Sequence, residues 1–241
     1  MGVASLLKLM KLEMRKFRIG SYIRAAMIAN IIMIGFICLV SLVENGMLDE
    51  VPNGMPFTDY NMAFYVIDTL VRATYIVFAS VLISRIVIDE FRNKSITVLF
   101  MYPINRKRLI AAKLLVVMLF TFVAVIVGNL IVGIGFYIVN LYASIIPEPI
   151  TWSLAAKELL KVTMGALATS FLSLIPLYFG MRKHSGPATI VSSLIVVAIV
   201  CQNVDGFTLY SIIAVPIGMA LLGAAIAYMS IRNIEHVDVL N

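Results

Sequence analysis

The sequence predicts an all-α membrane protein with six transmembrane helices, built as a single transmembrane domain over residues 1–241. Of the 241 residues, 61% are hydrophobic and only 13% are charged, and the mean hydropathy is +1.00. A soluble domain of this size could not hide so much apolar surface. The apolar residues also form runs that approach or exceed the roughly 20 residues that a helix needs to cross a bilayer. Basic residues gather in the gaps between these runs.

The segment before the first span, residues 1–20, predicts an amphipathic interfacial helix. Its apolar side chains fall on one arc of a helix, and its basic side chains fall on the other. Such a helix lies in the plane of the inner headgroups with its apolar face toward the lipid. A disordered basic tail is the alternative interpretation. A cleavable signal peptide is not expected, because the first long apolar run begins only after Arg24.

Six apolar runs are the candidate spans. The second and third are longer than a span requires, so we expect their inner ends to extend into the cytoplasm or the helices to tilt. The fifth is short and runs into a polar hairpin over Gln202–Gly206. The expected spans are Ala25–Val43, Asn61–Ile88, Leu109–Leu141, Leu159–Met181, Ala188–Gln202 and Thr208–Ile231.

The distribution of charge predicts the orientation. Most of the 19 basic residues lie before the first span, between the second and third spans, or beside Arg182. The first outer connection, Glu44–Tyr60, contains no Lys or Arg. Positive loops stay inside, so both termini are expected in the cytoplasm of a multi-pass protein of the bacterial plasma membrane. Lipid headgroups explain the basic residues better than nucleic acid does, and no nucleic-acid partner is expected.

The connection between the second and third spans, residues 89–108, is the longest polar and cationic insert. It opens with the acidic pair Asp89 and Glu90, and its apolar centre, Ile96–Tyr102, suits a short helix docked on a partner. We expect that helix to run from Glu90 to about Leu99. A plain topology signal is the alternative. The basic residues of this region and the start of the next span are Arg92, Lys94, Arg106, Lys107, Arg108 and Lys113.

Residues for catalysis are scarce. The chain has two histidines, His184 and His236, and both lie outside the expected spans. It has no phosphate-binding Gly-x-x-x-x-Gly-Lys-[Ser/Thr] loop and no zinc-binding motif. Its two cysteines, Cys38 and Cys201, lie in apolar runs and are expected to be small core residues. The sequence therefore predicts a protein that is not an enzyme and that binds no cofactor or metal itself.

Two sets of polar residues lie within the spans. Asp68 and Arg72 are four residues apart on one helix face, where they can form an ion pair. The pair either neutralises itself or takes part in gating or substrate contact. Gly165, Thr169 and Ser173 form a stripe of small and hydroxyl residues. Close helix packing explains this stripe more simply than a substrate path, and both interpretations stay open.

The polar connection also carries a spaced motif. Glu90 is followed five positions on by Ser95, eight further on by Pro103, and then by Arg106 and Lys113 at the entry to the next span. This pattern, with the six spans and the internal termini, resembles the permease subunit of ABC transporters of the type-2 exporter class. The glycine that often precedes the hydroxyl residue in that class is Lys94 here.

The resemblance implies a half-transporter that works with a separate ATP-binding-cassette ATPase, which would bind ATP and Mg. A second copy or a sibling permease would complete the path for an amphipathic substrate such as a drug, an antimicrobial peptide or a lipid. The alternative function is a membrane-bound peptide sensor or immunity component that binds without transport. The residues implied in coupling to the ATPase are Glu90, Arg92, Lys94, Ser95, Pro103 and Arg106.

Overall fold

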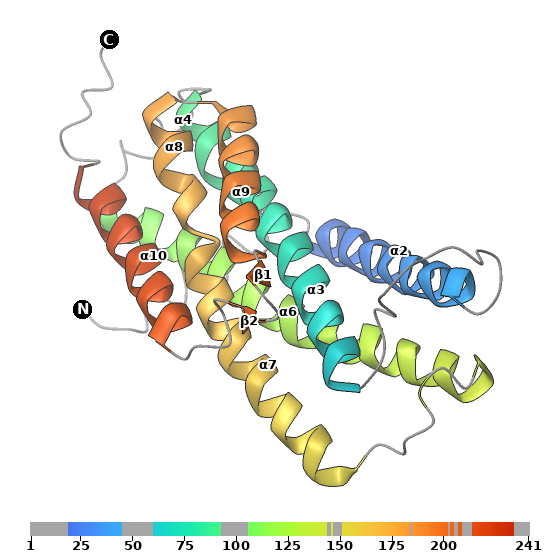
Figure 1. Ribbon diagram of the computed structural model, residues 1–241. Helices are drawn as coiled ribbons and strands as arrows, with labels where there is room; N and C mark the ends of the chain where they lie inside the picture. The colour runs from blue at the N-terminus through green and yellow to red at the C-terminus, as the bar shows by residue number, and fades with distance from the viewer. Residues whose placement is uncertain are drawn as a thin grey trace.

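The protein is a bundle of helices with one short hairpin between the last two (Figure 1). The computed structural model describes residues 19–44, 60–92, 106–143, 146, 151–183, 185–201, 203–204, 207–208 and 214–233. Its elements are α2 (Ile19–Glu44), α3 (Tyr60–Ile83), the π-helix η1 (Ser84–Ile88), α4 (Asp89–Arg92), α6 (Arg106–Ala143), α7 (Trp152–Leu172), α8 (Ile175–Lys183), α9 (Gly186–Val200), β1 (Asn203–Val204), β2 (Phe207–Thr208) and α10 (Ala214–Asn233). The interfacial helix expected over residues 1–20 lies almost entirely outside the described residues.

Helix α3 occupies the centre of the bundle. It packs against α6, α7 and α9, while α2 lies mainly on α6 and α10 lies on α7 and α8. Two apolar clusters are stacked along α3, one around Ile67 and Val71 and the other around Ile83 and Ile88. Buried alanines such as Ala63 and Ala79 allow close approach of the neighbouring helices, as is usual between helices in lipid.

Four of the expected spans agree with helices that are long and apolar enough to cross a membrane. These are Gly20–Val40, Tyr60–Ile88, Leu109–Tyr142 and Trp152–Lys183. Two shorter apolar stretches, Gly186–Val200 and Ala220–Met229, stand where the fifth and sixth spans are expected. The 15 residues of α9 rise about 22 Å at 1.5 Å per residue, less than the ~30 Å bilayer core, so the fifth helix is as short as expected. The count of six crossings stays a prediction.

Two boundaries differ from the expected ones. The fourth span is divided by a turn at Ser173 and Leu174, where α7 ends and α8 begins. Pro176, in the first turn of α8, lacks a backbone N–H and cannot continue the hydrogen-bond ladder of α7. The sixth span does not begin at Thr208, because Phe207–Thr208 forms an antiparallel strand pair with Asn203–Val204. Helix α10 begins at Ala214 instead.

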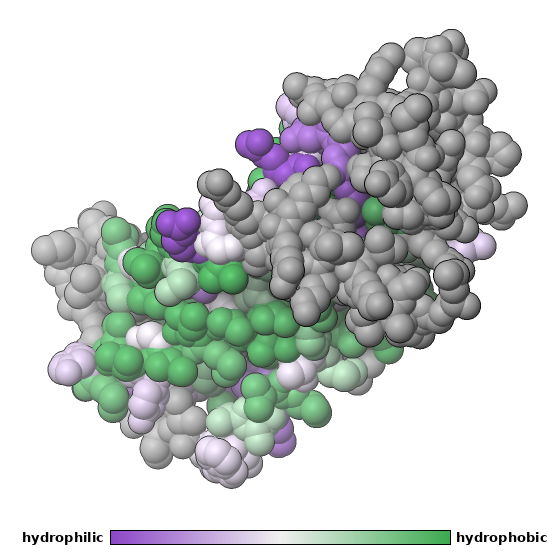
Figure 2. Space-filling view, turned by 180° about the vertical axis from the view of Figure 1, so that it is seen from behind, coloured by the Kyte–Doolittle hydropathy of each residue, from purple (hydrophilic) through white to green (hydrophobic). Residues whose placement is uncertain are grey.

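The outer surface is apolar over a broad band, as expected for a protein in lipid. Figure 2 shows hydrophobic residues covering much of one face. Helix α2 contributes strongly: Met27, Ile31 and Ile32 are all more than half exposed. A soluble protein would not leave such a surface in water, whereas lipid tails solvate it.

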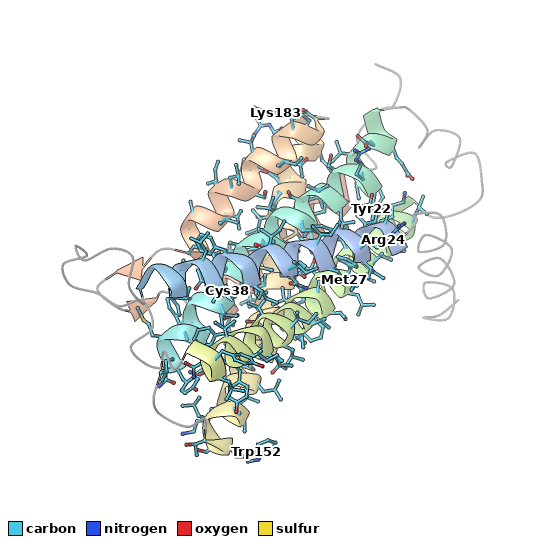
Figure 3. The ribbon with its side chains drawn as sticks, turned by 90° about the vertical axis from the view of Figure 1, so that its right-hand side faces the viewer. Tyr22, Arg24, Met27, Cys38, Trp152 and Lys183 are labelled. Carbon is cyan, nitrogen blue, oxygen red and sulfur yellow. The ribbon has the colours of Figure 1, made fainter. Side chains whose placement is uncertain are left out.

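Helices α7 and α8 together run from one end of the molecule to the other. Trp152, at the start of α7, and Lys183, at the end of α8, mark these opposite ends in Figure 3. Trp152 is 87% exposed. Trp and Tyr are enriched at membrane interfaces, where they anchor helices. The basic residues Arg182 and Lys183 lie in the last turn of α8, at the other end. The expected orientation, in which Lys183 is cytoplasmic, stays a prediction.

Candidate functional site

An ion pair lies within α3, deep in the bundle. The Arg72 Nε donates a 3.1 Å hydrogen bond to Asp68 Oδ1, and Arg72 Nη2 donates to Asp68 Oδ2. Only 10% of the Arg72 side chain and 17% of the Asp68 side chain are exposed. The predicted pair is therefore present and buried. Charges at this depth are costly and persist when they are paired.

Two neighbouring helices complete the surroundings of this pair. The Asn129 side chain of α6 lies near the Asp68 carboxylate, and its Nδ2 donates a 3.0 Å hydrogen bond to Val125 O of its own helix. On α7, Gly165 faces the guanidinium: a Cβ at this position would lie 2.8 Å from Arg72 Nη2. Glycine thus leaves the space that the guanidinium occupies. The pair joins three helices, which its spacing within α3 alone does not reveal.

The stripe along α7 and the turn after it faces inward, and its hydroxyl groups donate hydrogen bonds to nearby backbone carbonyls. The Thr169 Oγ1 donates to Gly165 O at 2.8 Å, and the Ser173 Oγ donates to Ser170 O at 2.8 Å. All three stripe residues, Gly165, Thr169 and Ser173, are buried. Hydroxyls bonded to the carbonyls of their own helix suit close packing. This geometry favours packing over a substrate path.

A second buried ion pair joins α4, which directly follows η1, to the first part of α6. Lys113 Nζ donates to Glu90 Oε2 and, at 3.3 Å, to the backbone carbonyl of Ile86. The Lys113 side chain is only 1% exposed, and that of Glu90 is 10% exposed. Both residues belong to the spaced motif, but their spacing does not predict that they contact each other. The missed signal was a lysine inside the apolar run that begins at Leu109, with no acidic residue on its own helix.

The π-helix η1 precedes Glu90 and contacts the second inner connection. Single-turn π-helices often lie at functional sites. A Cβ on Gly186 would lie 2.4 Å from Ser84 Oγ, and a Cβ on Gly180 would lie 3.0 Å from the Cδ1 of Ile88. The start of α9 and the end of α8 therefore lie directly against η1. The helical turn that precedes Glu90 is thus packed against both α8 and α9.

The implied coupling residues are only partly described. Glu90 lies in α4, Arg92 is the last residue of α4, and Arg106 is the first residue of α6. Lys94, Ser95 and Pro103 lie outside the described residues. We expected a separate helix to start at Glu90. In the structure residues 60–92 are continuously helical, so Glu90 does not cap the N-terminus of a new helix. The apolar run of α3 continues into the amphipathic Asp89–Arg92 turn without a helix-breaking residue, so no new N-terminus forms there.

Among the described residues, no group of three or more His, Cys, Asp or Glu side chains could hold a metal ion. Cys38 and Cys201 are both free thiols and half-buried. One ion pair, Glu90 with Lys113, joins the continuous helical stretch 60–92 to α6, whereas the Asp68–Arg72 pair lies within α3.

Comparison with known proteins identifies the family. A family described as "ABC-2 family transporter protein" matches residues 9–203. The uncharacterized protein YcbO of Bacillus subtilis (strain 168) is 38% identical over 232 residues, which cover 96% of this chain and 100% of the relative. No solved structure matches. The chain therefore belongs to the ABC-2 family of transporters, and the expected resemblance to an ABC-2 type permease is confirmed.

Proposed function

We propose that this chain is the permease subunit of an ATP-driven exporter and forms half of its translocation path. Membership of the ABC-2 family supports this proposal most strongly, because its membrane proteins are transporter permeases that generally work with an ATPase partner. ATP and Mg are then bound by that partner. A second copy of this chain or a sibling permease completes the path, within membrane lipid.

The polar connection is the part of the chain that a cytoplasmic ATPase would contact. Residues 93–105, named here the coupling segment, join α4 to α6. The residues proposed to serve coupling are Glu90, Arg92, Lys94, Ser95, Pro103 and Arg106. A docked partner that moves the coupling segment would move the inner ends of both helices. Work done by ATP hydrolysis would enter the membrane domain at this point.

The cargo is proposed to be amphipathic: a drug, an antimicrobial peptide or a lipid. The broad apolar surface of the helices is compatible with a cargo that enters from the surrounding lipid. Direction is outward, since the expected outer connections are short and offer no large domain to capture a substrate from outside.

The orientation gives a direct prediction. Thiol-reactive labels should reach a cysteine placed at Asn105 only from the cytoplasmic side, and one placed at Asn53 only from outside. The physical reason is the basic character of the first region and the absence of Lys or Arg from Glu44–Tyr60. Cys38 and Cys201 would first be replaced by alanine. Labelling at Asn105 from outside intact cells would show that the predicted topology is wrong.

Coupling can be tested on the charged residue at the end of α4. Arg92→Ala should lower transport and ATP hydrolysis by the co-purified ATPase together, while insertion and expression stay at wild-type levels. The reason is that Arg92 is proposed to contact the partner, and no membrane span is altered. Lys161→Ala, which removes an exposed cation at the outer part of α7, is the control and should change neither rate. If Arg92→Ala transported at the wild-type rate, the basic residues of this connection would serve only to set the topology.

A further inference from the structure

We infer that Lys113 is a positioning residue of the coupling machinery: it holds Glu90 so that both ends of the coupling segment move together. Glu90 then acts through Lys113 and not by touching the ATPase. This inference rests on the proposed coupling function and assigns distinct roles within its set of residues. The observations that carry it are the burial of this ion pair and its place between two helices.

The burial of Glu90 argues against a direct contact with a soluble partner. Its carboxylate is bonded to Lys113 Nζ, and 90% of its side chain is covered within this chain alone. An ATPase arginine that displaced Lys113 would leave a lysine in the interior without its carboxylate. Removing one member of a buried ion pair is strongly destabilising, so such a displacement is unfavourable.

The ion pair joins the two helices between which the coupling segment lies. Glu90 lies two residues before the end of α4, and Lys113 lies in the second turn of α6. The two residues are 23 positions apart, and the coupling segment lies between them. The pair links the helix that precedes the coupling segment to the helix that follows it. A force applied to the coupling segment therefore acts on α3 and α6 jointly.

The same two helices meet at two further depths. The Asn129 side chain of α6 lies near Asp68 of α3. Near the other end, Asn140 Nδ2 donates a 2.8 Å hydrogen bond to the hydroxyl of Tyr60. With a rise of 1.5 Å per residue, the contacts from Tyr60 to Glu90 span about 45 Å along the helix. In contact at three levels, α3 and α6 transmit a displacement as one body.

The π-helix extends this connection to the other inner loop. Lys113 also donates to the carbonyl of Ile86, which lies within η1, and η1 carries Ser84 against Gly186. A displacement of the Lys113 ammonium therefore reaches the start of α9 as well. One buried lysine thus connects the coupling segment, the central helix and the second inner connection.

A double-mutant cycle tests the inference. The four proteins are the wild type, Glu90→Gln, Lys113→Met and the double variant, each purified with the ATP-binding-cassette ATPase that co-purifies with the wild type. Each single variant leaves one buried charge without its partner and should lower both the unfolding midpoint and the stimulated ATPase rate. The double variant removes both charges, so it should regain a substantial part of the midpoint, but it still lacks the link and should keep the lowered ATPase rate.

Two controls sharpen the cycle. Lys113→Arg keeps the cation and should retain most of the stimulated rate. Lys161→Met removes the lysine of the exposed Lys161–Glu158 pair, and it should leave both the midpoint and the rate unchanged. A general loss of charge therefore cannot imitate the expected pattern.

The outcomes separate this inference from the proposed function. A wild-type ATPase rate for Lys113→Met beside a lowered rate for Glu90→Gln would make Glu90 a direct ATPase contact and overturn the inference. Additive losses of the midpoint would show that Lys113 does not hold Glu90, with the same consequence. Failure of the wild-type chain to stimulate any ATPase would overturn the proposed function, while the four midpoints would still decide whether Lys113 holds Glu90.

Discussion

Asp68→Ala is expected to destabilise the folded protein by about 3–5 kcal/mol, because it leaves the guanidinium of Arg72 in the interior without its carboxylate. The cost should be visible as a lower unfolding midpoint of the purified protein in detergent micelles. Removing both charges, as in Asp68→Ala with Arg72→Met, should recover much of the loss, since no lone charge then remains.

The depth of the pair decides the size of this effect. Exposed ion pairs contribute about 0–1 kcal/mol, so the Lys161→Met variant should unfold close to the wild type. Equal midpoints for Asp68→Ala and the wild type would place the Asp68–Arg72 pair in water, lining a hydrated path and not the packed interior.

Gly223→Ala is expected to separate α10 from α7. A Cβ at this position would lie 2.2 Å from Phe171 O and 2.7 Å from the carbonyl carbon of Phe171, which are backbone atoms. No side-chain rotation can relieve such a contact, so one helix must move away from the other. Overpacking typically costs about 1–3 kcal/mol, and a backbone contact belongs at the upper end of that range. The unfolding midpoint of the purified variant measures the loss.

Gly218 of the same helix provides the matched control. A Cβ on Gly218 would meet no atom within 4 Å, so Gly218→Ala should be neutral or slightly stabilising because alanine favours a helix more than glycine does. If both alanine variants unfolded at the same midpoint, α10 would not lie against the backbone of α7 as described.

The helices themselves were predictable because lipid imposes a simple rule on the sequence. Long apolar runs such as Asn61–Ile88 and Leu109–Leu141 have to be helical in a bilayer, and both agree closely with helices of the structure. The break at Ser173 and the late start of α10 were not foreseen. Both depend on local backbone geometry, namely a turn before Pro176 and a strand pair at Phe207, which hydropathy does not report.

The candidate site was predictable only where its partners are close in the sequence. Asp68 and Arg72 are one helical turn apart, so their contact followed from spacing alone. Their contacts with Asn129 and Gly165 depend on how three helices pack, and the pairing of Glu90 with Lys113 crosses 23 positions. One sequence contains no direct signal for such distances. What it did contain was an unexplained lysine within the apolar start of α6.

The central claim is that this membrane domain works with a separate ATPase. The most direct measurement is the rate of ATP hydrolysis by the co-purified ATP-binding-cassette ATPase in proteoliposomes, with and without this chain. We predict that the chain raises this rate, that an amphipathic substrate raises it further, and that Arg92→Ala abolishes the increase. Stable binding of a peptide by the chain, with no associated ATPase and no effect on hydrolysis, would contradict the claim and indicate a sensor.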